Sequence, residues 1–78
     1  MNITVKYFGM AAETTGKNLE VISTEVKNLK EAKQLLLTLY PSLKGITFQI
    51  ALNQSFAKDS TSLNDNDELA LLPPFAGG

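Results

Sequence analysis

The residues with the clearest chemical potential stand at the end of the sequence, which closes on Gly77-Gly78. At average glycine usage of about 7%, two glycines end a chain by chance roughly once in 200. Glycine lacks a Cβ, so it passes through a narrow channel and leaves the neighbouring carbonyl open to attack. A free α-carboxyl has a pKa of about 3.3–3.7 and is inert while ionised. We therefore expect Gly78 to react only after another protein activates it, for example as an acyl-adenylate made with ATP, and Gly77 to give access to its carbonyl.

The segment that leads to these glycines has the composition of an arm. Pro73 and Pro74 stiffen its exit from the last predicted strand, and Phe75 offers an apolar anchor. Six extended residues span roughly 20 Å at about 3.3 Å each, enough to enter a partner's active site. The simpler interpretation is a frayed terminus, but the prolines and the phenylalanine favour an arm. We divide the chain into a domain over residues 1–72 and an arm over residues 73–78.

The composition leaves little for catalysis within the chain itself. Its 78 residues include no Cys and no His, and its cations, all lysines, number 7 against 8 acids, a net charge of −1. Thiolate nucleophiles, disulfides and histidine bases are therefore excluded, and we expect no bound cofactor or metal. A nearly neutral chain without arginine is a poor partner for nucleic acid. No apolar run approaches the ~20 residues of a membrane span and no signal peptide is recognisable, so we expect a cytoplasmic protein without nucleic-acid or membrane partners.

A group of acids near the last predicted strand is the other candidate for chemistry: Asp59, Asp65, Asp67 and Glu68. Oxygen ligands without the spacing of a calcium loop are weak grounds for a metal site. Asn and Asp tolerate left-handed backbone, so residues 64–67 predict a turn instead. The lysines are interpreted as a solvated surface.

Alternating apolar residues predict strands over residues 3–8, 19–26, 47–53, 56–57 and 68–72. Residues 10–15, between Gly9 and Gly16, are expected to form a loop. With one amphipathic helix between two hairpins, the order of elements predicts an α+β domain of the β-grasp type. Its mixed sheet of four to five strands would pair the first and last strands at the centre and carry the helix on one face.

The predicted helix covers residues 28–40. Asn28 is placed to cap its first turn, Glu31 completes a capping box, and Pro41 ends it. At about 100° per residue, an arc of about 140° holds Leu29, Ala32, Leu35, Leu36, Leu39 and Tyr40. Leu37 falls outside this arc and is expected at the surface.

Alternation along the strands predicts which apolar side chains leave the core. One face of the sheet, toward the helix, would hold Ile3, Val5, Phe48, Ile50, Leu52, Leu69 and Leu71. Phe8, Ala70 and Leu72 then lie on the opposite face. Single exposed apolar residues mean little, but several beside the arm indicate a docking patch. The expected partner interface comprises Phe8, Phe56, Leu72, Pro73, Pro74, Phe75 and Ala76.

These residues also carry a family resemblance that covers nearly the whole chain. The matching stretches are residues 71–78 (LLPPFAGG), 63–70 (LNDNDELA), 51–56 (ALNQSF) and 5–9 (VKYFG), with Glu13 and Gly16. They are similar to the family of ubiquitin-like sulfur carriers that includes the small subunit of molybdopterin synthase. Two positions depart from the family pattern, because Ala12 stands where an arginine is frequent and Asn66 where a glycine is frequent.

The resemblance implies a mechanism and a set of partners. An ATP-dependent adenylyltransferase related to ubiquitin-activating enzymes would adenylate Gly78, and sulfur transfer would leave a thiocarboxylate. Two such subunits would flank a dimer of the large catalytic subunit of molybdopterin synthase. Each arm would donate sulfur to cyclic pyranopterin monophosphate, and the chain alone would be non-catalytic.

Two other functions remain open at the level of sequence. One keeps the chemistry of the arm but serves thiamine synthesis, tRNA thiolation or protein modification through Gly78. The other is a β-grasp interaction module with a passive tail, for which the loss of Gly78 would have no consequence.

Overall fold

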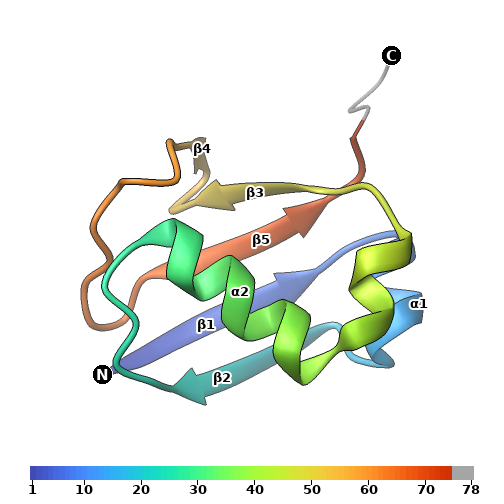
Figure 1. Cartoon of the computed structure of the whole chain (residues 1–78), viewed down its shortest axis with the longest axis horizontal. Coiled ribbons are helices and arrows are strands. Elements are labelled where there is room, and N and C mark those ends of the chain that lie inside the picture. Colours follow the sequence, from blue (N-terminus) through green and yellow to red (C-terminus); the bar gives the residue numbers. More distant parts are fainter. Residues whose placement is uncertain (75–78) are drawn as a thin grey trace.

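The computed structural model describes residues 1–74, which form a five-stranded sheet with helices against one of its faces (Figure 1). The elements in chain order are β1 (Asn2–Tyr7), α1 (Met10–Thr15), β2 (Leu19–Ser23), α2 (Leu29–Leu39), the 3-10 helix η1 (Pro41–Gly45), β3 (Gln49–Leu52), β4 (Ser55–Phe56) and β5 (Glu68–Leu72). All five predicted strands are present, although β2 and β3 are shorter than the predicted 19–26 and 47–53. None of the helices in these residues has the length and apolar content that a membrane crossing needs.

The strands pair in the order β2-β1-β5-β3-β4. The first and last strands, β1 and β5, lie side by side at the centre and run parallel, whereas the other pairs are antiparallel. β5 ends beside the C-terminal end of β1 (Figure 1). Residues 73 and 74 therefore leave the sheet at the end of the two central strands, where Phe8 follows β1. The predicted β-grasp fold, a mixed sheet with one main helix, is confirmed.

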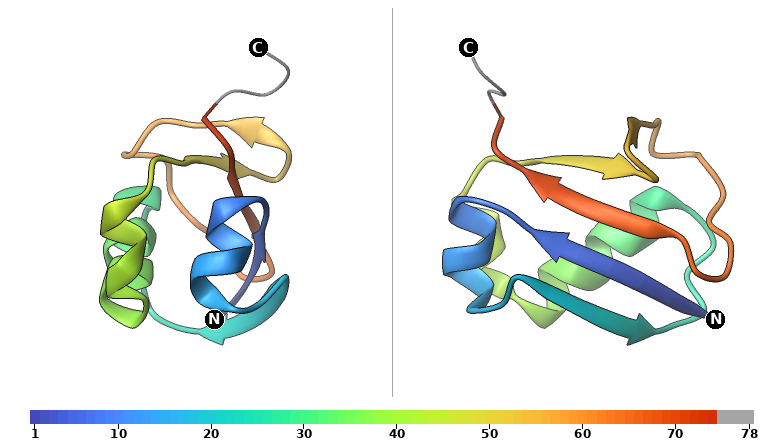
Figure 2. Two further views of the ribbon diagram at one scale, coloured as in Figure 1. Left: turned by 90° about the vertical axis from the view of Figure 1, so that its right-hand side faces the viewer. Right: turned by 180° about the vertical axis from the view of Figure 1, so that it is seen from behind.

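One face of the sheet is covered by α2, with the 3-10 helix beside it, and the other face lacks such a layer (Figure 2). The buried cluster between sheet and helices contains Ile3, Val5, Tyr7, Ala11, Leu29, Ala32, Leu36, Leu43, Leu63, Leu69 and Leu71. Phe48, Ile50 and Leu52 pack against it while remaining partly exposed. The predicted division of the strand residues between the two faces is therefore confirmed.

Helix α2 begins as its sequence predicts. The Asn28 side chain accepts a hydrogen bond from the Glu31 backbone N–H at 2.9 Å, and Glu31 Oε1 accepts from the Lys27 N–H at 2.9 Å. These two bonds satisfy donors that a helix start leaves free. The helix ends at Leu39, before the Tyr40-Pro41 step.

The expectation for the last turns of α2 was wrong. Leu37 is half-buried and packs against the core, whereas Leu39 is exposed. The cause is η1, which follows directly and brings Leu43 to the Leu37 side of the helix. Nothing in the sequence pattern of α2 itself indicated that a second short helix would cover this side.

Residues 10–15 form the helix α1, and the predicted loop was wrong. Gly9 and Gly16 take positive φ angles of 56° and 73°, so they turn the chain at each end of a six-residue helix. Its one buried residue, Ala11, reaches the core, and the Thr15 hydroxyl donates to the Ala11 carbonyl at 2.9 Å. The two glycines that were interpreted as loop boundaries are the points where the helix begins and ends.

Candidate functional site

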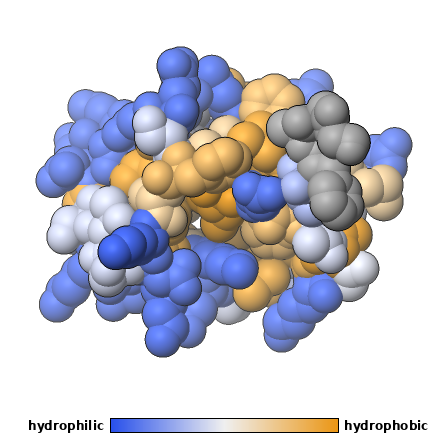
Figure 3. Space-filling view, turned by 90° about the horizontal axis from the view of Figure 1, so that it is seen from above, coloured by the Kyte–Doolittle hydropathy of each residue, from blue (hydrophilic) through white to orange (hydrophobic). Residues whose placement is uncertain are grey.

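The uncovered face of the sheet carries an apolar groove. Alternation brings side chains from β1, β3, β4 and β5 to this face, where they enclose about 400 Å³. The groove is lined by Lys6, Phe8, Ala51, Gln54, Phe56, Glu68, Ala70 and Leu72. Viewed from above the molecule, an apolar patch occupies the middle of the surface and hydrophilic side chains surround it (Figure 3). We call the groove that these eight residues line the open-face groove.

Three of the predicted interface residues meet in this groove. Phe8 is 45% exposed and Phe56 is 67% exposed, although both are large apolar side chains. Leu72 is partly exposed and completes the apolar lining with them. Their positions confirm that they lie together on the face opposite to α2. Exposed aromatic and aliphatic side chains that line one groove are typical of a docking surface.

The groove also contains residues that sequence reasoning did not select. Lys6 and Glu68 form an ion pair at 3.0 Å on neighbouring central strands. Each is about one-third exposed, so solvent screens the pair and its contribution to stability is small. Its position on the rim gives the groove a polar border beside the apolar lining.

The base of the arm is held against the domain by three contacts. The Phe8 N–H donates to the Leu71 carbonyl at 3.0 Å, which continues the β1–β5 pairing up to the arm. Pro73 lies so close to Gly9 that a Cβ there would meet Pro73 Cγ at 3.1 Å. The Gln49 side-chain amide donates to the Pro74 carbonyl at 2.6 Å.

These contacts involve two residues that the sequence did not single out. Gly9 is required both for its positive φ and for the close approach of Pro73. Gln49 precedes Pro74 by 25 positions, and only the β3–β5 pairing, which sets Gln49 opposite Leu72, brings them together. Four residues of the predicted site lie outside the described residues: Phe75 and Ala76 of the expected interface, Gly77, and Gly78, where the reaction is predicted.

The acidic segment after Leu63 is a structural turn. Asp67 is almost fully buried; its Oδ2 accepts from the Asn64 N–H at 2.7 Å and its Oδ1 from the Asn53 side-chain amide at 3.0 Å. Asn66 takes a φ of 69°, the left-handed conformation expected for the residue that replaces glycine. Within residues 1–74 no three potential metal-ligating side chains are grouped as a site requires. The predicted turn is confirmed.

A polar cluster lies on the covered face of the sheet, between β2 and the end of α2. Glu20 Oε2 accepts hydrogen bonds from the hydroxyls of Tyr7, at 2.6 Å, and Tyr40, while Lys17 pairs with Oε1 at 3.2 Å. Burial alone would raise the pKa of Glu20, but the hydrogen bonds from Tyr40, Tyr7 and Lys17 outweigh it and lower that pKa. Desolvation and the Glu20 carboxylate together raise the pKa of Tyr7 far above its ordinary value. These shifts hold Glu20 ionised and Tyr7 neutral, which suits a structural anchor better than acid–base chemistry.

Comparison with known proteins gives matches along essentially the whole chain. A molybdopterin synthase sulfur carrier subunit from Mycobacterium tuberculosis is 38% identical over 85 aligned positions, covering 100% of this chain and 99% of its own. The structure of subunits 1 and 2 of the molybdopterin-converting factor of Helicobacter pylori, a protein–protein complex, matches with a TM-score of 0.69 and 32% identity over 100% of both chains.

A more distant relative confirms the fold. A proposed molybdopterin converting factor subunit 1 from Pyrococcus furiosus superimposes with a TM-score of 0.89 at 19% identity, over 96% of this chain and 99% of that one. The model of the ThiS family matches residues 5–78, a range that includes both the open-face groove and the final glycines. The chain therefore belongs to the ThiS family.

Proposed function

We propose that this protein is the sulfur carrier subunit of molybdopterin synthase. The observation that carries the proposal is the full-length similarity to molybdopterin synthase sulfur carrier subunits, combined with the match of the ThiS family to the final glycines. The related Helicobacter pylori protein forms a complex with a second subunit, which supports a large catalytic subunit as the main partner. The activation step consumes ATP, so we place the protein in the cytoplasm.

The proposed chemistry takes place at the Gly78 carboxyl group and uses groups supplied by partners. The carboxylate oxygen attacks the α-phosphate of ATP on an adenylyltransferase, which releases pyrophosphate and forms an acyl-adenylate. A donor of sulfide-level sulfur (HS−) then attacks the acyl carbon, AMP leaves, and a thiocarboxylate remains. In the large subunit this sulfur forms a bond to a carbon of cyclic pyranopterin monophosphate and displaces an oxygen substituent there, which joins carrier and pterin as a thioester. Water then cleaves the thioester at the Gly78 carbonyl, which restores the carboxylate and leaves the sulfur on the pterin. The chain itself holds no cofactor and contributes the carrier group and its delivery.

The described residues bind the partner protein and orient the arm toward it. Phe8 follows β1 and Leu72 ends β5, so the groove opens at the edge where the arm leaves the sheet. A partner bound in the groove therefore receives the arm close to its own surface. Beyond Pro74 four residues remain, and an extended segment of that length reaches about 13 Å at about 3.3 Å per residue. Docking would bring Gly78 to an active site within this reach.

The carrier chemistry is tested by intact mass measurement. The protein is incubated with its activating enzyme, ATP and a sulfur donor, and we expect the exchange of one oxygen for sulfur in the full-length chain. A variant without Gly78 should remain unmodified, while Gln34→Ala, an exposed change on α2, should react as the wild type does. Sulfur transfer by the variant without Gly78 would overturn the proposal. Thiocarboxylation of the full-length chain without transfer to the pterin would instead assign the protein to another sulfur-carrier pathway.

The docking role of the open-face groove has its own test. Phe8→Asp places a charge in the apolar lining and should weaken binding of the large subunit by at least about 30-fold, as for a central interface residue. Val21→Asp is the matched control, because Val21 is 61% exposed on β2 but does not line the groove. Both variants should keep the thermal unfolding temperature of the wild type. Equal affinities of the two variants would contradict the docking role.

A further inference from the structure

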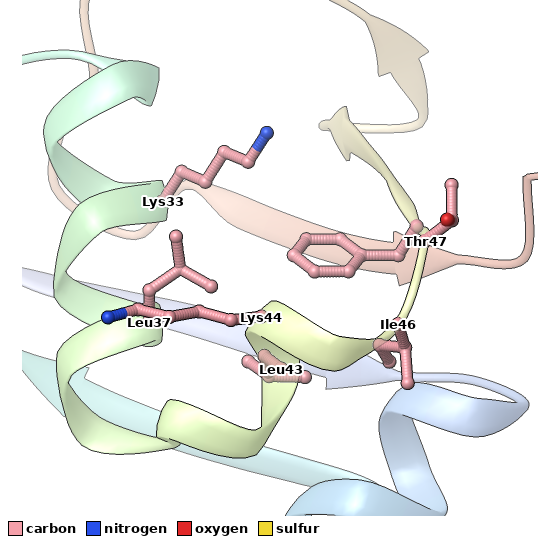
Figure 4. A pocket seen from close by; sticks show the side chains of 7 residues that line it. Lys33, Leu37, Leu43, Lys44, Ile46 and Thr47 are labelled. Carbon is pink, nitrogen blue, oxygen red and sulfur yellow. The ribbon is translucent and has the colours of Figure 1, made fainter.

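A second hollow lies on the helical side of the molecule, away from the open-face groove. It encloses about 360 Å³ between α2, η1 and the segment that enters β3. Its lining consists of Lys33, Leu37, Leu43, Lys44, Ile46, Thr47 and Phe48 (Figure 4). We call it the basic hollow. It shares no lining residue with the open-face groove.

The floor of the basic hollow is apolar and supported by the core. Leu43 is fully buried, and Leu37, Ile46 and Phe48 are half-buried and pack against the core cluster. Side chains held in this way cannot collapse to fill the hollow without disturbing the packing beneath them. The floor therefore offers a fixed apolar surface to a ligand side chain.

The rim of the basic hollow is cationic. Lys33 extends from α2 across the hollow, and Lys44 runs back from η1 beside Leu37 (Figure 4). The Lys33 ammonium lies 5.8 Å from the centre of the Phe48 ring, within the range of a cation–π contact. Within residues 1–74 the ion pairs involve Met1, Lys6 and Lys17, so Lys33 and Lys44 have no carboxylate partner there.

The segment that supplies the lining of the hollow contains no acidic residue. No Asp or Glu occurs between Glu31 and Asp59, a stretch that supplies every lining residue of the hollow. The nearest acid in sequence, Glu31, is occupied at the start of α2, where it accepts from the Lys27 N–H. Two lysines over an apolar floor therefore form a local positive field on a chain whose net charge is −1.

We propose that the basic hollow binds an acidic peptide segment of a partner protein, with one bulky apolar side chain inserted between flanking carboxylates. The apolar side chain would rest on Leu43, Ile46 and Phe48, while the carboxylates pair with Lys33 and Lys44. A phosphate group fits less well, because the lysines flank an apolar floor and the lining contains no arginine fork. The site is independent of the proposed sulfur chemistry and gives the chain a second binding surface, formed by residues other than those of the open-face groove.

The test uses the full chain labelled with nitrogen-15 and the acetylated, amidated pentapeptide EEFEE as the probe. The peptide is added up to about 5 mM, a concentration at which weak specific binding can be measured. Its binding should shift the amide resonances of residues 33, 37 and 44–48. Raising the salt from about 0.05 M to about 0.5 M should weaken binding several-fold, because the charges involved are exposed. The peptide EEAEE should bind about tenfold more weakly, since it lacks the apolar side chain.

Matched charge reversals locate the site. The double variant Lys33→Glu with Lys44→Glu should lose at least tenfold in affinity, whereas Lys30→Glu with Lys58→Glu, two exposed lysines outside the lining, should bind nearly as the wild type does. Spectra of both free variants check that the fold is intact. The proposal is overturned if no shifts occur, if they map to the open-face groove, or if the peptide KKFKK or inorganic phosphate produces the same shifts. None of these outcomes depends on Gly78, so they leave the proposed carrier function untouched.

Discussion

The two faces of the sheet are built from the same strands and serve opposite purposes. On β5, Leu69 and Leu71 are fully buried under α2, while Ala70 and Leu72, which alternate with them along the strand, line the open-face groove. At the end of β1, Tyr7 is buried, whereas the next residue, Phe8, is exposed. Neighbouring residues of similar chemistry are thus divided between core and surface by the two-residue period of a strand.

Polar groups follow the same division. On the covered face Glu20 is enclosed by two tyrosines and a lysine, so its charge is fully hydrogen-bonded. On the open face Lys6 and Glu68 form a pair that solvent reaches. The covered face therefore determines the stability of the domain, and the open face is available for recognition. Substitutions on the two faces should therefore have separable effects.

The largest expected difference is between two adjacent leucines of β5. Leu71→Ala removes a fully buried side chain and should lower the free energy of unfolding by about 2–5 kcal/mol. Leu72→Ala, at a partly exposed position of the open face, should lower it by about half as much, because water already reaches part of this side chain in the folded state. Urea denaturation of both variants measures the difference. Equal losses of stability would show that the open face contributes to the core, which the division of roles forbids.

A smaller effect is expected from the polar cluster of the covered face. Glu20→Gln keeps the shape of the side chain but removes the charge that accepts from Tyr7, Tyr40 and Lys17. Hydrogen bonds to charged groups contribute about 1.5–3 kcal/mol, so the variant should lose stability of that order at neutral pH. Chemical denaturation at pH 7 gives the comparison, with Glu25→Gln as the control for an exposed glutamate.

The pH dependence of this loss follows from the lowered pKa of Glu20. Its contribution is present above the unfolded-state pKa of about 4.3 and disappears as the pH falls through the lower folded-state pKa. The stabilities of wild type and Glu20→Gln should therefore begin to converge below about pH 4.3 and become equal once the pH lies below the lowered folded-state pKa. A difference that stayed constant into strong acid would mean that the carboxylate charge plays no part in the cluster.

Local sequence was enough to predict the elements whose causes are local. Strand alternation gave the two faces of β5, and the Asn28 cap fixed the start of α2. The same alternation placed Phe8 and Leu72 on one face, because it needs no knowledge of strand order. The β-grasp topology followed from the order of elements and the rule that a single helix covers one sheet face.

The features that sequence analysis missed depend on residues far apart in the chain. Helix α1 is too short to show a hydrophobic period, and its one buried residue, Ala11, gives no pattern. The exposure of Leu39 and the burial of Leu37 were set by η1. Glu20 joins two tyrosines that stand 13 and 20 positions away, and only the folded chain brings them together.

The smallest expected effect comes from the hydrogen bond that Gln49 makes to the base of the arm on the open face. Gln49 lies opposite Leu72 on this face and donates to the Pro74 carbonyl. Gln49→Ala removes one exposed hydrogen bond, so stability should change by no more than about 1 kcal/mol. The arm would then leave the domain in more directions, and a smaller fraction of molecules would present it correctly. The KM of the activating enzyme for the carrier should rise about two- to tenfold, with kcat unchanged.

Two further variants separate aiming of the arm from loss of fold. Gln49→Lys restores a donor within reach of the Pro74 carbonyl and should recover most of the lost affinity, whereas Gln49→Glu offers only acceptors and should be at least as impaired as Gln49→Ala. Gln34→Ala removes the same kind of side chain from an exposed position of α2, so its KM should stay at the wild-type value. If Gln49→Lys and Gln49→Glu behaved alike, the hydrogen bond could not be what directs the arm, and the open face would act through its groove alone.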